Sequence, residues 1–121
     1  MNIGFVKIYV TDLSKSLEFY TDKLGLKLDY TDKENWAQFE SGAEVSLAIE
    51  RVEADHTIFG SKMVGRYAGV TLMVDDIKKS YVQLMSKGVE FTGEPQKQQW
   101  GGILAHLKDL DGNILTIMQE A

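Results

Sequence analysis

The sequence predicts an α+β fold built from two copies of a βαβββ unit, and three observations lead to this prediction. The stretches Val6–Leu24 and Val70–Lys87 align without a gap, so that Asp12 matches Asp76. Each passes from an alternating apolar pattern to the spacing of an amphipathic helix. Further along, FESGAEVSLAI and KDLDGNILTIM each place a glycine turn before an alternating strand pattern. A repeat close to half the chain indicates a duplicated unit.

The first unit is expected to begin with a strand over Phe5–Val10, which alternates around Lys7 and Tyr9. Asp12 is suited to cap the helix that follows, because its carboxylate can accept from free N–H groups of the first turn. Gly25 supplies the left-handed residue that ends this helix. The predicted buried face of this helix comprises Leu13, Leu17, Tyr20 and Leu24. After it we predict strands over Leu26–Tyr30, Trp36–Phe39 and Val45–Ile49, and a polar turn over Thr31–Asn35.

The second unit repeats this order from Gly69 onward. Residues 70–74 alternate as a strand, Asp76 caps the next helix and Gly88 ends it. Asp109 and Asp111 belong to a turn, where Asp-Gly-Asn suits a positive φ angle. The remaining predictions are a buried helix face of Ile77, Tyr81, Leu84 and Met85, strands over 89–92, 102–108 and 114–119, and a loop over 93–99 around Pro95.

The length of 121 residues and the composition indicate a single domain over 1–121. It divides into a first module (1–50), a connecting segment (51–67) and a second module (68–121). The absence of cysteine excludes disulfides and thiolate zinc sites. With no signal peptide and no membrane span, we expect a cytoplasmic protein. The net charge of −5, with scattered Lys and Arg, argues against nucleic acid as a partner.

The chain resembles the vicinal oxygen chelate superfamily, which includes glyoxalase I, extradiol dioxygenases and bleomycin-resistance proteins. The resemblance rests on VTDLSKSLEFYTDKLGL, VDDIKKSYVQLMSKGV and WGGILAHLKDLDGNILTI. It implies two βαβββ modules with curled mixed sheets around a ligand cleft, and in many members a homodimer. In metal-using members, a His begins the first strand of each module, and a Glu, His or Gln lies on the last strand.

These four metal positions fall on residues that do not bind divalent ions in such sites. The first-strand positions, seven residues before each capping Asp, are Phe5 and Gly69. The last-strand positions are Ser46 and Thr116. A register slip of one residue turns side chains to the other face and reaches no His or Glu. The sequence therefore predicts no cofactor and no family-type metal.

Two histidines are the candidates for acid–base or ligand-binding chemistry. His106 lies in the strand LAHLK, where an ordinary hydrogen-bonded strand residue is the simpler interpretation and a general base the alternative. His56 follows Asp55 in the connecting segment and is expected to be a solvated loop residue. A displaced metal site of His56 and His106 with Glu50 or Glu53 stays open, although no spacing supports it.

Aromatic residues near strand starts and loops are the candidates for a ligand wall, against core packing as the alternative. Trp100 precedes two glycines and can present a flat ring to a planar ligand. The carboxylate pairs Asp75–Asp76 and Asp109/Asp111 have structural tasks at a helix start and a turn. The predicted ligand-binding residues are Phe5, Trp36, Phe39, Ser46, Tyr67, Trp100, His106 and Thr116.

Three functions follow as hypotheses. The first is a homodimeric small-molecule-binding protein that holds an aromatic or amphipathic ligand in an apolar cleft without a family-type metal. The second is a lyase, dioxygenase or isomerase with displaced metal ligands or with His106 as a metal-free acid or base. The third is a protein-interaction domain in which Phe59 and Met63 of the apolar segment 50–67 contact a partner.

Overall fold

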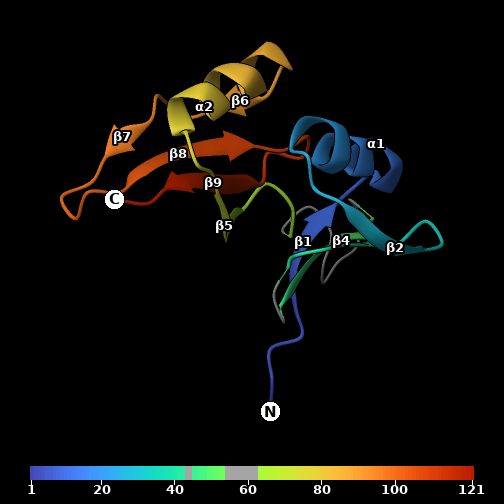
Figure 1. Cartoon of the computed structure of the whole chain (residues 1–121). Helices are drawn as coiled ribbons and strands as arrows, with labels where there is room; N and C mark the ends of the chain where they lie inside the picture. Colours follow the sequence, from blue (N-terminus) through green and yellow to red (C-terminus); the bar gives the residue numbers. More distant parts are fainter. Residues whose placement is uncertain (43–44, 54–62) are drawn as a thin grey trace. The chain divides into compact units, whose positions relative to one another are not determined.

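The computed structural model describes residues 1–42, 45–53 and 63–121, which form two compact units, Met1–Arg66 and Tyr67–Ala121. In each unit a helix covers one face of a mixed sheet (Figure 1). The predicted α+β class with two curled mixed sheets is confirmed. In the described part of the chain, no helix has the length and apolar character needed to cross a bilayer.

The first unit contains a sheet in the order β1-β4-β3-β2, in which β1 runs parallel to β4 and the other pairs are antiparallel. The helix after β1 begins as α1 and continues as a π-helix, η1. The elements are β1 (Phe5–Val10), α1 (Leu13–Glu18), η1 (Phe19–Lys23), β2 (Leu28–Asp32), β3 (Trp36–Phe39) and β4 (Ser46–Arg51).

The second unit contains a sheet in the order β5-β9-β8-β6, with β7 also paired to β8. The parallel pair is β5 with β9, which repeats the β1–β4 pairing of the first unit. Its elements are β5 (Tyr67–Met73), α2 (Ile77–Ser86), β6 (Glu90–Phe91), β7 (Gln96–Lys97), β8 (Ile103–Lys108) and β9 (Ile114–Gln119).

Both predicted helix caps are confirmed. The Asp12 carboxylate accepts from the Lys15 N–H at 3.0 Å, and the Asp76 carboxylate accepts from the Lys79 N–H at 3.1 Å. The turn before β9 is also held by hydrogen bonds to a carboxylate. Asp109 accepts from the backbone N–H groups of Asp111 and Asn113 and from the Asn113 side chain, each at 2.9 Å. These carboxylates therefore shape the backbone, as predicted.

Several element boundaries differ from the prediction for local reasons. β5 begins at Tyr67 rather than at residue 70, because Tyr67 already pairs with Ile114 of β9; the register then shifts between Tyr67 and Thr71, where Gly69 has a φ of +71°. β2 takes in Thr31 and Asp32, which the sequence predicts as part of a turn, and β7 lies within the predicted loop 93–99.

The predicted buried face of α2 is only partly correct. Ile77 is fully buried and Tyr81 packs edge-on against Phe91 with ring centroids 4.7 Å apart. Met85 is half exposed. The helix lies against β8 and β9, and the predicted apolar face is therefore buried at Ile77 but not at Met85.

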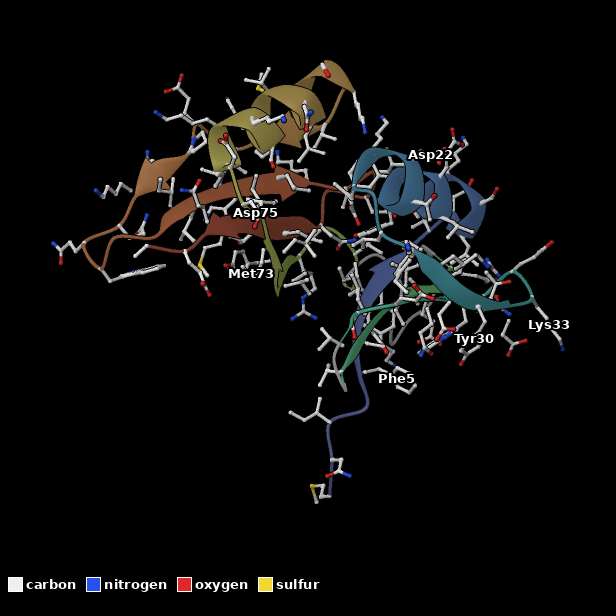
Figure 2. All side chains as sticks on the ribbon, in the orientation of Figure 1. Phe5, Asp22, Tyr30, Lys33, Met73 and Asp75 are labelled. Carbon is white, nitrogen blue, oxygen red and sulfur yellow. The ribbon has the colours of Figure 1, made fainter. Side chains whose placement is uncertain are left out.

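Strand alternation gives each sheet a helix-covered core face and an open face. In the first unit, Ile8, Val10, Ala37 and Ile49 are buried on the core face. The residues that alternate with these along β1, β3 and β4 point to the other face of the sheet, where the register places them side by side. Figure 2 shows Phe5 and Tyr30 on the side of this sheet away from α1. We call this surface the open face of the first unit; it comprises Phe5, Lys7, Tyr9, Tyr30, Asp32, Trp36, Gln38, Ser46, Ala48 and Glu50.

Candidate functional site

The open face of the first unit joins three of the predicted ligand-binding residues. Phe5 and Ser46 are direct neighbours in the β1–β4 register. The ring of Trp36, from β3, meets the Phe5 ring edge to face, with centroids 5.5 Å apart and planes at 87°. Phe5 remains 49% exposed. Two aromatic rings in contact, one of them half exposed, form an apolar surface on which a ring-shaped ligand can pack.

Two polar atoms on this face are buried and unpartnered. Among the described residues, neither Trp36 Nε1 nor Gln38 Oε1 has a hydrogen-bond partner. Gln38 is only 8% exposed, and its β4 neighbour Ala48 is fully buried. The open face thus combines apolar rings with unused hydrogen-bonding capacity.

Lys7 and Glu50 supply charge beside these rings. Lys7 Nζ lies 3.3 Å from Glu50 Oε1, 5.6 Å from the Tyr9 ring centroid and 5.9 Å from that of Trp36. The hydrogen bond to Glu50 is the main cause that raises the pKa of Lys7 above 10.5, while partial burial acts in the opposite direction. The ammonium is therefore charged at neutral pH and held beside the indole, where cation–π attraction favours it.

Phe39 does not belong to this cluster. It follows Gln38 in β3, so its side chain points to the core face, where it is 1% exposed. Its ring packs on Tyr20 of η1, with centroids 5.7 Å apart. The structure therefore places Phe39 in the hydrophobic core rather than among the predicted ligand-binding residues.

The second unit brings together His106, Thr116 and Tyr67. His106 and Thr116 are register partners on β8 and β9, and His106 Nδ1 lies 2.8 Å from Thr116 Oγ1. The Tyr67 ring meets the imidazole edge on, at 5.9 Å between centroids. Thr116 is buried, whereas Tyr67 is 63% exposed. Nδ1 is thus engaged by Thr116, whereas Nε2 has no hydrogen-bond partner among the described residues.

Trp100 presents an exposed ring held by a glycine. The residue is 59% exposed, and a Cβ added at Gly102 would overlap the six-membered ring of the indole. The ring therefore lies directly against the Gly102 backbone, which only glycine allows. This close approach fixes one face of the indole and leaves a large part of it accessible, as a stacking surface requires.

The donor set does not fit the metal that the family resemblance implies. Phe5 and Gly69 offer no ligand atom, Ser46 offers a hydroxyl, and the Thr116 hydroxyl is engaged by His106. Gly69 also has a φ of +71°, at which a side chain is strained. In the described ranges, no three His, Asp or Glu side chains gather where they could hold a metal ion. We therefore derive no chemistry through a metal.

Some predicted residues lie outside this description. His56 and Phe59 fall in 54–62, so the displaced metal site with His56 and the interaction surface of segment 50–67 lie largely outside the described residues. Conversely, the prediction missed Lys7 and Gln38, and it named Glu50 only as a ligand of the displaced metal site. Strand parity was an available signal for Lys7 and Gln38, because they lie two residues from Phe5 and Trp36.

The chain belongs to the Glyoxalase/Bleomycin resistance protein/Dioxygenase superfamily, whose profile matches residues 2–117. It is 31% identical over 125 residues to the uncharacterized protein YraH of Bacillus subtilis, covering 97% of each chain. It is 31% identical over 120 residues to a probable lactoylglutathione lyase of Synechocystis sp., covering 93% of this chain and 90% of the relative. The structure of TnmS3, an antibiotic binding protein from Streptomyces sp. CB03234, is 25% identical and superimposes with a TM-score of 0.80, covering 100% and 97% of the two chains.

Proposed function

We propose that this chain is a cytoplasmic, homodimeric protein that binds an aromatic or amphipathic small molecule without a family-type metal. The observation that carries the proposal is the replacement at the four family metal positions, which hold Phe5, Ser46, Gly69 and Thr116. At the first of these, an aromatic ring in contact with Trp36 stands where the family places an imidazole. Apolar contact, rather than coordination, is what this position offers a ligand.

The likeness to TnmS3 supports binding as the function. That protein is described as antibiotic binding, and its similarity extends over the whole chain. The exposed Phe5 ring, which contacts Trp36, is consistent with the same kind of activity, because aromatic rings offer a planar ligand a stacking surface. A planar, partly apolar molecule is therefore the ligand class that we propose.

A titration with anthraquinone-2-sulfonate as a planar amphipathic probe tests the proposal. The two tryptophans, Trp36 and Trp100, allow the site to be located, because each single Trp→Phe variant leaves one reporter. We expect saturable quenching in the wild-type chain and a weaker affinity in at least one variant. Sedimentation at several concentrations tests the homodimer. A monomer with no saturable quenching would contradict the proposal.

The metal-free part of the proposal has its own test. Metal analysis of the purified protein should find no stoichiometric ion, and chelation followed by Zn²⁺, Ni²⁺ or Mn²⁺ should leave the melting temperature unchanged. An ion that binds only the folded state would raise that temperature by mass action. A one-to-one metal with a clear shift would contradict the assignment.

The geometry of His106 favours one second candidate, a metal-free acid–base enzyme. Thr116 orients the imidazole through Nδ1, which leaves Nε2 for a substrate proton. The relative from Synechocystis sp. is described as a probable lactoylglutathione lyase, so lactoylglutathione is the first compound to assay. Turnover that is lost in His106→Ala, with the probe still bound, would favour this candidate over simple binding.

A further inference from the structure

Trp36 and Gln38 present an unusual combination on the open face of the first unit. The indole Nε1 and the amide Oε1 are both buried without a hydrogen-bond partner among the described residues. Buried polar atoms in native proteins are nearly always partnered, and each exception calls for an explanation. The buried side chains of the second unit show the contrast, since Asp109 accepts three hydrogen bonds at 2.9 Å.

The two atoms come from neighbouring positions on one surface. Trp36 and Gln38 are two residues apart in β3, so both side chains stand on the same face. Ala48 lies beside Gln38 in the register and Lys7 lies beside Ala48 on the next strand. Lys7 donates to Glu50 at 3.3 Å, and no described donor reaches Gln38 Oε1. The hydrogen-bonding capacity of both atoms is thus unused by the described part of the unit.

We propose that Trp36 Nε1 and Gln38 bind a carboxamide, lactam or imide group of the ligand, beside the Phe5 and Trp36 rings. This inference rests on the proposed small-molecule-binding function and specifies its ligand class. The indole N–H can only donate, so the ligand must carry an acceptor. Gln38 Oε1 requires a donor, so the ligand must carry an N–H or O–H as well. An amide supplies both in one planar group that stacks beside aromatic rings.

A pair of isosteric probes tests this recognition. The molecule 2-quinolone has a fused aromatic ring with a lactam C=O and N–H, and coumarin has the same shape and C=O with a ring oxygen in place of the N–H. Both are titrated into ¹⁵N-labelled protein, and the indole N–H signals are assigned with the Trp36→Phe and Trp100→Phe variants. We expect 2-quinolone to bind about tenfold more tightly than coumarin and to shift the Trp36 signal, since one hydrogen bond is worth about this factor.

The control variant is Gln38→Met, which keeps the length of the side chain and removes the amide. It should lose the preference for 2-quinolone while still binding both probes; Gln38→Leu serves the same purpose if Gln38→Met folds poorly. Equal affinity of the two probes for the wild-type chain would overturn the inference and leave the proposed function intact. So would a preference that survives in Gln38→Met.

Two further outcomes separate the inference from the function on which it rests. If neither quinolone nor coumarin binds while anthraquinone-2-sulfonate still quenches, only the inference is overturned. A long-lived water hydrogen-bonded to the Trp36 indole, detected by water–protein cross-relaxation and retained with each probe, would likewise overturn only the inference. If none of the three probes binds, the proposed function is overturned as well.

Discussion

Replacing Gln38 by Met should stabilise the free protein, although Gln38 is a buried residue. Most substitutions at buried positions destabilise. Here the amide is only 8% exposed and its Oε1 has no partner among the described residues. An unsatisfied buried polar group costs about 1–3 kcal/mol relative to the unfolded state, where water satisfies it. Met keeps the unbranched length and removes that loss, so we expect the free energy of unfolding to rise by about 1–2 kcal/mol.

The measurement is urea denaturation of Gln38→Met in a Trp100→Phe background. Trp36 is then the only tryptophan, and it lies two residues from the substitution within the same unit. Its fluorescence reports the unfolding of that unit directly. The slope against urea should stay unchanged, so that a shifted midpoint measures stability alone.

Lys27→Met is the matched control, because Lys27 is exposed in the same unit. An exposed substitution of this kind should change stability by no more than about 0.5 kcal/mol. If Gln38→Met lowers the free energy of unfolding by about 1 kcal/mol or more while Lys27→Met is neutral, the amide has a partner in the free protein. The reasoning that assigns it to a ligand would then be refuted.

Three further predictions concern other parts of the chain. Gly102→Ala should weaken anthraquinone-2-sulfonate binding by up to about tenfold, because its methyl group displaces the Trp100 ring from the glycine; unchanged affinity in a Trp36→Phe background would contradict this role. Asp76→Ala should lower the free energy of unfolding by about 1 kcal/mol in urea through loss of the α2 cap, whereas Asp76→Asn should stay near the wild type. The raised pKa of Lys7 predicts a contribution to stability that is complete below pH 10.5 and lost as the pH rises through the folded-state value, so the stability difference between wild type and Lys7→Met should shrink in alkaline solution; a difference that is constant with pH would argue against the Lys7–Glu50 pair.

The sequence was sufficient for those elements whose pattern is local. β1, β3 and β9 have the predicted bounds, because alternation and flanking turn residues specify a strand without reference to its partners. The caps at Asp12 and Asp76 were predictable for the same reason. By contrast, β7 is two residues long and exists through backbone pairing with β8, which leaves no side-chain pattern to detect.

The spacing of apolar residues also could not predict the change from the α-helix α1 to the π-helix η1. The Leu24 N–H bonds to the Phe19 carbonyl five residues back, at 3.1 Å, where an α-helix would reach back four. Phe19 and Tyr20 are adjacent in sequence, yet both are buried. A single apolar stripe at α-helical spacing predicts a uniform α-helix. Two adjacent buried residues do not fit such a stripe.

The candidate site was predictable in its residue types more than in its geometry. Aromatic character pointed to Phe5 and Trp36, which the structure brings into contact. Phe39 was assigned to the same surface, although strand parity places it on the opposite face. Gln38 was missed because an isolated glutamine is normally a solvated residue. Only burial, which depends on the neighbouring strands, reveals that its amide is unpartnered among the described residues.

The register of the first unit explains why a few substitutions can change the chemistry of this fold. Phe5 and Ser46, which stand at two of the family's metal positions, remain direct neighbours on parallel strands. The backbone that would hold an imidazole and a carboxylate together instead holds a ring and a hydroxyl. The aromatic ring cannot coordinate an ion, but it can exclude water beside the Trp36 ring that it contacts. A hydrogen bond to a ligand is stronger at polar atoms from which water is excluded than on an exposed surface, because water does not compete as a hydrogen-bond partner. The replaced metal positions Phe5 and Ser46 and the polar recognition that we propose at Trp36 and Gln38 thus share one face of the sheet.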